Sequence, residues 1–358
     1  MDFLDRFTLQ QISRRSFLKL SGNGLLALFC MPLLERGYRP GMEIDPQEIP
    51  YQFGRITGNG VTVYDKPSLG GNFIKNYYQD LVFPIDHITL GDEEPRYNRI
   101  WYHMNGEGYV HSGSVQPVEL LENPTQVYIP PQGKLAEVTV PYTDTFWTLE
   151  RPDRVAYRLY YNTTHWVNGP IRDDTGHDWY RIPDDKWDFY YMVRAEHMRI
   201  ITPAEVSALS PGVPPEAKRL EIRLPEQVVI AYENDWPIYM CRTATGARFI
   251  DGDYRTRPGR YITARKRPSR HMAAGDPAAP SSYDLPGVPW VTYLTESGVS
   301  FHGTYWHNDF GKPRSHGCIN LSCAAARWIY RWTTPVVPFG ETWYLEDTGT
   351  IVDAIGEY

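Results

Sequence analysis

Short runs of alternating apolar and polar residues are frequent beyond residue 50 and predict β-strands. In KRLEIRLPEQVVIAY, residues 218–232, Leu220, Ile222 and Leu224 alternate with polar residues, and a second apolar run follows a turn. This segment predicts a strand, a turn and a second strand. The same pattern predicts further strands at 238–243, 259–264, 289–294, 299–302 and 342–345.

One helix is predicted near the end of this region. Ser322 suits an N-cap, the alanines at 324–326 favour helix, and Trp328 and Trp332 lie four positions apart on one face. The strand at 342–345 is then expected to close the sheet. Aromatic residues make up 14% of the chain, and 30 prolines and 29 glycines favour short strands and turns, so we expect a mainly β protein.

Two similar units are predicted upstream, at 51–120 and 130–203. Each has a strand that begins Trp-Tyr, at Trp101 and Trp179, followed by a turn and a strand rich in Tyr and Val. Both units resemble bacterial SH3-like small barrels, which implies contact with cell-wall glycans. Ordinary core packing of the aromatic side chains is the alternative. The aromatic residues in question are Trp187, Tyr190 and Tyr191.

The N-terminal residues 1–39 are interpreted as a targeting signal rather than as part of the folded domains. SRRSFLK, residues 13–19, precedes an apolar run at 24–34 and resembles a twin-arginine export signal. We therefore expect an exported protein in the cell envelope or at the outer face of the cytoplasmic membrane, with the segment either removed or kept as an anchor. Residues 40–50 are predicted to be a linker.

Residues 301–322 read FHGTYWHNDFGKPRSHGCINLS and place three histidines and one cysteine within seventeen positions. A thiol attacks carbonyl groups as thiolate and therefore needs a base beside it at neutral pH. His302 ends a predicted strand, and the fifteen residues between it and Cys318 can fold back so that the two meet. Gly317 permits a tight turn, and the amides of Gly317 and Cys318 are candidates for an oxyanion site.

This segment carries a family resemblance. SHGCIN at 315–320, preceded by HGT at 302–304 and FG at 310–311, resembles the active-site signature of the L,D-transpeptidases of bacterial cell-wall synthesis. The resemblance implies a β-sandwich catalytic domain at 216–347, with a flap over the cleft and with the segment 268–288 shaping donor access. The flanking parts are predicted to be a linker at 204–215 and a tail at 348–358.

The resemblance also assigns roles. It implies that Cys318 is the nucleophile and His302 the general base and acid, with the ring of His302 oriented by the Gly303 carbonyl. His316 and Gly317 are expected to complete the pocket. The residues expected to contact substrate are Trp306, Tyr293, Ser315 and Asn320.

The implied reaction is a 3→3 cross-link between peptidoglycan stem peptides, one as donor and one as acceptor, without a cofactor or metal. Carbapenem-type inhibitors are expected to react with the same thiol. Hydrolysis of the thioester, an L,D-carboxypeptidase activity, is an alternative, and a noncatalytic cell-wall-binding protein is another. A zinc site built from the histidines and Cys318 is a third. The formal net charge of −7 gives no general electrostatic basis for binding nucleic acid, and the basic run at 265–267 is interpreted as a solvated strand end.

Overall fold

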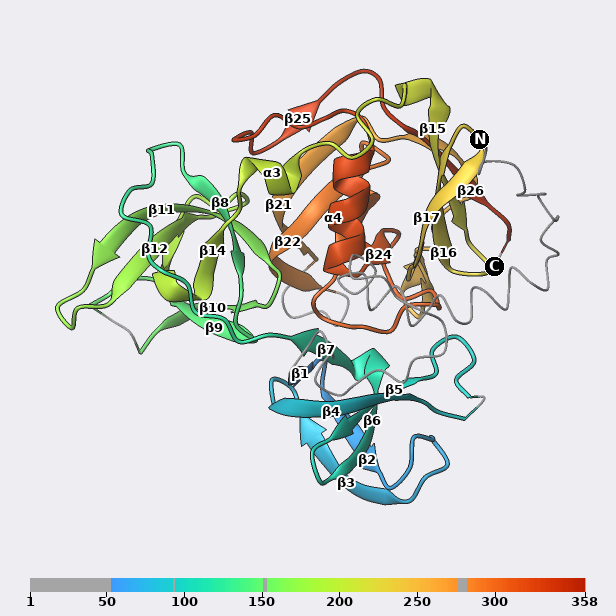
Figure 1. Cartoon of the computed structure of the whole chain (residues 1–358), viewed down its shortest axis with the longest axis horizontal. Coiled ribbons are helices and arrows are strands. Elements are labelled where there is room, and N and C mark those ends of the chain that lie inside the picture. The colour runs from blue at the N-terminus through green and yellow to red at the C-terminus, as the bar shows by residue number, and fades with distance from the viewer. Residues whose placement is uncertain (1–52, 93, 151–152, 276–281, 358) are drawn as a thin grey trace, which may run out of the picture. The chain divides into compact units, whose positions relative to one another are not determined.

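The computed structural model describes residues 53–92, 94–150, 153–275 and 282–357. The chain divides into Met1–Pro50 and Tyr51–Tyr358, so the predicted signal and the 40–50 linker lie outside the described residues. The described part is mainly β, as predicted (Figure 1). None of its helices is long and apolar enough to cross a membrane.

The first seven strands form one sheet in the order β3-β2-β6-β5-β4-β1-β7. Its interior is filled by alternating apolar side chains, among them Ile56, Val63 and Tyr102. A single 3-10 turn, η2 (Ser112–Ser114), precedes the last strand. The strands are β1 (Phe53–Ile56), β2 (Gly60–Tyr64), β3 (Phe73–Tyr78), β4 (Val82–Leu90), β5 (Ile100–Met104), β6 (Gly108–His111) and β7 (Val115–Val118).

The next seven strands repeat this arrangement in the order β10-β9-β13-β12-β11-β8-β14, which is the same order counted from each first strand. Trp101 and Trp179 lie in the equivalent strands β5 and β12, and η3 (Ala195–His197) matches η2. The likeness to SH3 barrels stays a prediction. The strands are β8 (Lys134–Val138), β9 (Tyr142–Phe146), β10 (Val155–Tyr160), β11 (Thr164–Arg172), β12 (Asp178–Pro183), β13 (Tyr190–Arg194) and β14 (Met198–Ile200). Tyr191 belongs to the core of this sheet, whereas Trp187 and Tyr190 are exposed.

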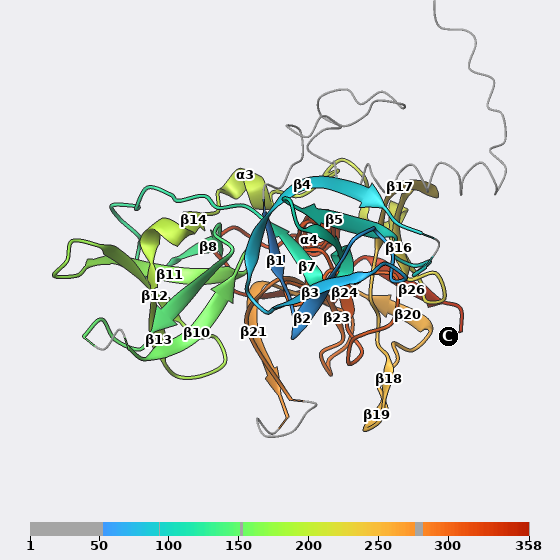
Figure 2. The same cartoon turned by 90° about the horizontal axis from the view of Figure 1, so that it is seen from below.

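Two five-stranded sheets form the C-terminal domain. One has the order β17-β16-β15-β26-β20 and the other β24-β23-β22-β21-β25, and β18 pairs with β19. In Figure 2, β21 and the β18–β19 pair run downward as separate arms. The strands are β15 (Lys218–Arg223), β16 (Val228–Glu233), β17 (Trp236–Arg242), β18 (Arg248–Phe249), β19 (Gly252–Asp253), β20 (Gly259–Ile262), β21 (Arg265–Ala274), β22 (Tyr283–Tyr293), β23 (Ser300–Gly303), β24 (Ile319–Leu321), β25 (Tyr344–Leu345) and β26 (Ile351–Ile355).

Helix α4 (Cys323–Trp332) contacts β22 and β23 and begins as predicted. Ser322 is its N-cap, because the Oγ atom accepts a hydrogen bond from the Ala325 amide at 3.2 Å. Trp328 and Trp332 stack with ring centroids 5.4 Å apart, on the face that packs inward.

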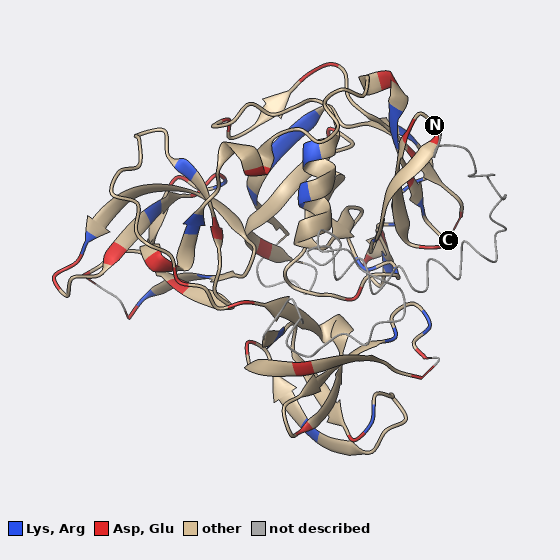
Figure 3. Ribbon diagram, in the orientation of Figure 1, with Lys and Arg blue, Asp and Glu red and all other residues tan. Residues whose placement is uncertain are grey.

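The predicted linker 204–215 is attached to this helix. It contains most of α3 (Pro203–Val206) and the start of η4 (Pro215–Ala217). Arg327 of α4 donates to the Glu205 carboxylate at 3.0 Å. Acidic and basic positions are interspersed along the strands (Figure 3).

Three sequence predictions are wrong for this domain. Residues 348–358, predicted as a tail, contain β26, whose Val352 and Ala354 are buried between β15 and β20. The strand at 342–345 does not close the sheet, because β25 is a two-residue edge strand on β21. The basic run 265–267 is not solvated, because Lys266 is fully buried and donates to the Tyr330 carbonyl at 2.9 Å, at the end of α4.

Candidate active site

Parallel pairing of β23 and β24 brings the two predicted catalytic residues together. Phe301 pairs with Ile319 and His302 with Asn320, so Cys318 lies beside Ser300, one step before β24. Side chains of residues two apart on a strand point to the same face. His302 and Cys318 therefore project from the same side of the sheet, as diagonal neighbours.

The imidazole of His302 is fixed by its own strand end. Its Nδ1 atom lies 3.1 Å from the Gly303 carbonyl oxygen and donates to it, because a carbonyl can only accept. Nε2 is then the nitrogen with a free lone pair. Burial lowers the pKa of His302 to about 4, against the opposing effect of the Gly303 hydrogen bond. The ring is thus neutral at pH 7 and able to accept a proton through Nε2.

The Cys318 thiol is half-buried and lies against Ser300, a residue that the sequence reasoning did not select. Its Sγ atom is 3.8 Å from Ser300 Oγ and 3.7 Å from the Gly298 carbonyl oxygen. Burial raises the pKa of the Cys318 thiol, and hydrogen bonds from Ser300 oppose the rise. The resting pair is therefore a thiol beside a neutral imidazole. Period-two spacing from His302 is the signal that places Ser300 on the catalytic face.

The turn before the cysteine is closed by Ser315. Its hydroxyl donates to the Cys318 carbonyl at 2.5 Å and accepts from the Gly317 amide at 3.2 Å. Gly317 has a φ of 113°, which L side chains rarely adopt, and its carbonyl accepts from Thr256 Oγ1 at 2.9 Å. The Gly317 amide is therefore engaged within the turn, so of the two predicted oxyanion donors the Cys318 amide is the better candidate. Ser315 is buried, and its contacts are those of a turn residue rather than a substrate ligand.

His316 and Trp306 lie at the edge of the site. His316 is exposed and stacks on Phe249 of β18, with ring centroids 4.7 Å apart and planes at 17°. Tyr254 contacts the same imidazole edge-on at 4.7 Å. The Trp306 ring lies 5.7 Å from that of His302, so this predicted substrate residue lies beside the predicted base.

The other two predicted substrate residues are buried. Tyr293 is covered by the Arg265 guanidinium, 4.0 Å from its ring centroid. Asn320 contacts His307, with 3.0 Å between the side-chain amide and Nε2. These contacts fit packing roles, and the substrate contact expected from the sequence stays a prediction for both residues.

The hydrogen bonds of His307 define its tautomer. Nδ1 accepts from the Asp309 amide at 3.2 Å, so Nε2 carries the proton. Nε2–H then requires an acceptor, and Oδ1 of Asn320 is buried without a partner in the orientation assigned to the amide. Exchanging the oxygen and nitrogen of the Asn320 amide would give Nε2–H of His307 this acceptor. Burial lowers the pKa of His307 to about 3, so it is neutral as well.

A zinc site made of the three histidines and Cys318 does not match this arrangement. Nε2 of His307 is engaged by Asn320, and the His316 ring stacks on Phe249 at the edge of the site. In the described ranges, groups of three potential ligands occur only around His103 and around His197, both outside the catalytic domain.

The loop between His302 and Cys318 is held by the first sheet, a contact that the sequence did not reveal. Arg55 of β1 donates to the Tyr305 carbonyl at 2.7 Å. The Asn308 amide donates to the Gly113 carbonyl at 3.0 Å, and Lys312 Nζ donates to Tyr97 Oη at 2.8 Å. Contacts between residues as far as 250 positions apart, such as Arg55 and Tyr305, thus fix the segment between His302 and Cys318.

Comparison with known proteins gives this site a family context. Residues 217–352 match the family model YkuD, the L,D-transpeptidase catalytic domain. No curated protein matches the chain.

Solved structures of L,D-transpeptidases show a weaker likeness. One from Xylanimonas cellulosilytica is 22% identical, with 44% of this chain and 65% of that chain covered and a TM-score of 0.28. One from Mycobacterium smegmatis is 17% identical, with 54% and 90% covered and a TM-score of 0.32. LdtMt1 in complex with imipenem is 14% identical, with the same coverage and TM-score.

These TM-scores are too low to carry an argument, and the chain spans only 50%, 60% and 65% of the length of several such structures. The match of the family model is the stronger finding, and it includes both His302 and Cys318. Residues 217–352 are therefore similar to the catalytic domain of the L,D-transpeptidases.

Proposed function

We propose that the chain is an L,D-transpeptidase that forms 3→3 peptidoglycan cross-links through a thioester on Cys318. The observation that carries the proposal is the shared face of β23 and β24, from which His302 and Cys318 project. The Gly303 carbonyl engages Nδ1 of His302, and Nε2 remains to accept the thiol proton. This is the arrangement that an acyl transfer by a thiol requires.

In the first step, Sγ of Cys318 attacks the carbonyl between the third stem residue and the terminal D-alanine. The thiol proton moves to Nε2 of His302, and the carbonyl oxygen becomes an oxyanion. Collapse of this intermediate breaks the C–N bond, and the imidazolium returns the proton to the departing D-alanine amine. The lowered pKa of His302 favours this return of the proton.

In the second step, an amine of an acceptor stem attacks the thioester carbonyl. His302 accepts the amine proton, the C–S bond breaks, and the thiolate of Cys318 takes the proton back from the imidazolium. The net change is one amide broken and one amide formed, so neither a cofactor nor a metal takes part.

The test uses tetrapeptide-containing peptidoglycan fragments, with products analysed by mass spectrometry. The proposal expects loss of D-alanine with formation of a cross-linked dimer, and a covalent mass on the protein after incubation with a carbapenem. The Cys318→Ala variant should keep the fold and take up no label. Tripeptide without dimer would instead identify an L,D-carboxypeptidase, and absence of both products and label would indicate a noncatalytic wall-binding protein.

We further propose that the protein works outside the cytoplasmic membrane and that its N-terminal sheets contact cell-wall glycan. The paired Arg14 and Arg15 support export, and the exposed rings of Trp187 and Tyr190 support glycan contact. Replacing both arginines by lysine should retain the protein in the cytoplasm, and unchanged export would contradict the twin-arginine interpretation. Trp187→Ala should weaken cosedimentation of the full chain with peptidoglycan, whereas wild-type cosedimentation would contradict this contact.

A further inference from the structure

The hairpin of β21 and β22 reaches the catalytic site. Tyr283, the first residue of β22, pairs with Ala274, and its ring centroid lies 6.3 Å from that of His316. Burial raises the pKa of Tyr283, and the nearby Cys318 thiol adds to the rise. The position of this hairpin therefore decides what lies beside the cysteine.

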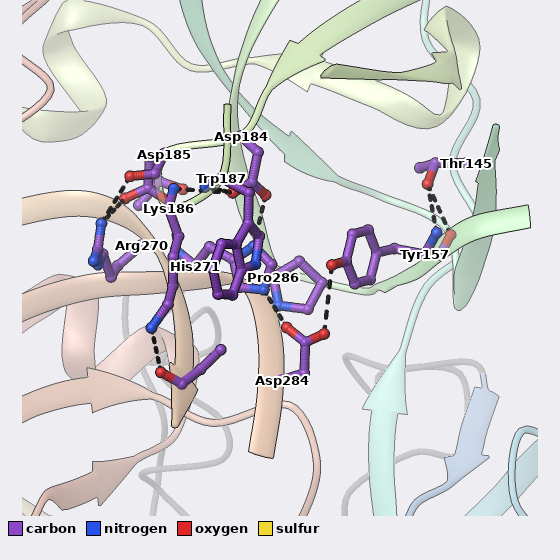
Figure 4. A network of polar contacts seen from close by, with 12 residues as sticks. Thr145, Tyr157, Asp184, Asp185, Lys186, Trp187, Arg270, His271, Asp284 and Pro286 are labelled. Atoms are coloured by element: carbon purple, nitrogen blue, oxygen red, sulfur yellow. Dashed lines mark hydrogen bonds and ion pairs between the residues drawn. The ribbon is translucent and has the colours of Figure 1, made fainter. Parts of the chain in front are cut away.

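A histidine in the middle of the hairpin joins it to the second sheet (Figure 4). Nδ1 of His271 in β21 lies 2.6 Å from Oδ2 of Asp184, which follows β12, and Nε2 contacts Oδ1 of Asp284 in β22. Both ring nitrogens thus face carboxylate oxygens, which can only accept. Only the doubly protonated ring donates from both nitrogens, so this geometry holds His271 as an imidazolium. The side chains of His271 and Asp184 are 2% and 1% exposed, so water does not compete for the bond between them, whereas the Asp284 carboxylate is 53% exposed.

The residues after Asp184 extend the contact along β21. The Asp185 carboxylate accepts from the His271 amide at 2.6 Å and from Arg270 Nη1 at 2.7 Å. Lys186 Nζ donates to the Ala273 carbonyl. The segment 184–186 therefore contacts the hairpin at three successive positions, with charged groups on both sides.

Strand β11 fits the same hairpin closely. Thr164 Oγ1 donates to the Pro268 carbonyl at 2.7 Å. Gly287 of β22 has a φ of 71°, and a Cβ atom at this position would lie 2.1 Å from Cε1 of His165. The imidazole of His165 thus occupies the space that a side chain at 287 would need, and the two domains pack without a gap there.

We propose that the segment 184–186 positions the β21–β22 hairpin beside the catalytic cysteine, with His271 as the positioning residue that joins Asp184 to Asp284. The proposal rests on the proposed function for its effect on acylation. The second N-terminal sheet then acts on the reaction itself by holding one wall of the site.

The charge of His271 gives this contact a pH dependence. Burial alone lowers the pKa of His271, but the hydrogen bonds and charges of Asp184 and Asp284 outweigh it and raise the pKa above its ordinary value. The contact is therefore complete below about pH 6.5 and is lost as the pH rises through this higher pKa. The titratable and charged groups around His271 are Asp184, Asp185 and Lys186 after β12, Tyr157 of β10, His165 of β11, Tyr191 of β13, Arg267 and Arg270 of β21, and Asp284 of β22.

The test measures acylation by a carbapenem in the full chain, separating the concentration for half-maximal rate from the rate at saturation. Asp184→Asn and Asp284→Asn should each raise the half-saturating concentration about 5- to 10-fold. The half-saturating concentration of the double variant should not exceed that of the more strongly affected single variant, because both substitutions act through His271. Asp178→Asn, which removes a carboxylate of the same sheet paired with exposed Arg172, should match the wild type. Wild-type values for both single variants, or fully additive effects, would overturn the proposal.

Two further variants keep the test independent of folding. Lys186→Met loses the contact with the Ala273 carbonyl, together with a cation–π contact to Trp187, and should raise the half-saturating concentration less than Asp184→Asn, in the same direction. His271→Gln should remove the alkaline rise of this concentration that the wild type shows above about pH 7. Equal pH profiles for His271→Gln and the wild type would refute the role of His271.

Hydrogen exchange separates this proposal from the proposed function. In Asp184→Asn, amides of residues 283–288 should exchange about 10-fold faster than in the wild type, whereas those of α4 should not change. A wild-type protein that no carbapenem acylates would defeat the proposed function, but the exchange rates would still report the hairpin. Unchanged exchange at 283–288 would defeat the positioning role, whatever the activity.

Discussion

Gly317→Ala offers a direct test of how the turn before Cys318 serves the reaction. Gly317 has a φ of 113°, outside the conformations that alanine adopts easily. The new Cβ would meet Val299 Cγ2 at 3.6 Å and the Tyr254 carbonyl oxygen at 3.7 Å, which are ordinary contacts. Steric overlap is therefore absent, and the cost is that of the backbone alone, about 1–3 kcal/mol.

This backbone cost can be relieved only if φ at residue 317 changes. Such a change would rotate the peptide that carries the Cys318 amide and weaken the bond from Thr256 Oγ1 to the Gly317 carbonyl. A displacement of the thiol by about 1 Å is enough to cost about 10²-fold in rate. We therefore expect Gly317→Ala to lose about 1–3 kcal/mol of unfolding free energy and about 10²-fold in carbapenem acylation.

Gly340→Ala is the matched control. Gly340 has a φ of 99° in an exposed turn and no atom within 4 Å of the added Cβ, so the backbone cost is similar. Denaturant unfolding should show comparable losses of stability for the two variants, and mass spectrometry of the acyl-enzyme should show slow labelling only for Gly317→Ala. Wild-type labelling of Gly317→Ala would refute the reasoning, as would an equal loss of labelling in Gly340→Ala.

Two predictions concern the buried histidines. His302→Ala should slow acylation by about 10²–10⁴, the usual contribution of general acid–base catalysis. His307→Ala should lower the melting temperature but change the acylation rate of the folded protein little. Equal losses of acylation rate in rapid-mixing assays would contradict these assignments. The unfolding free energy should fall as the pH drops from about 6.5 toward 4, because His165, His302 and His307 stay neutral in the fold, with pKa values of about 3, about 4 and about 3, while the unfolded chain takes up protons near pH 6.5. His271 opposes this trend as a single group, so denaturant midpoints that rise toward pH 4.5 would contradict the prediction.

The juxtaposition of His302 and Cys318 was predictable from sequence because its signals are local. His302 ends an apolar strand, and Cys318 lies in a short motif in which Gly317 indicates a special backbone conformation. The N-cap of α4 was predictable for the same reason, since Ser322 bonds within three residues of itself. Such features depend on neighbours along the chain, and the residue types alone report them.

The features that sequence reasoning missed depend on distant partners. β26 is short and half-exposed, and it is a strand because β15 and β20 flank it. A lysine such as Lys266 is expected at the surface from its charge. It is buried here because its ammonium group donates to carbonyls at the end of α4, which the sequence does not reveal. The Gly317 amide was expected to serve an oxyanion, and only the position of Ser315 Oγ shows that it is engaged.

The attachment of the loop 305–312 to the first sheet couples a ligand bound by that sheet to a donor peptide bound at the catalytic site, without contact between the two ligands. Arg55 and Gly113 belong to that sheet, and the loop they hold joins His302 to Cys318. Suppose that acylation displaces the loop. A ligand of the first sheet would then change the affinity of the catalytic site for its donor peptide. Thermodynamic reciprocity requires that the donor change the affinity of the first sheet for that ligand by the same factor. A protein engaged with the cell wall and a free one would then differ in how tightly they hold the same stem peptide.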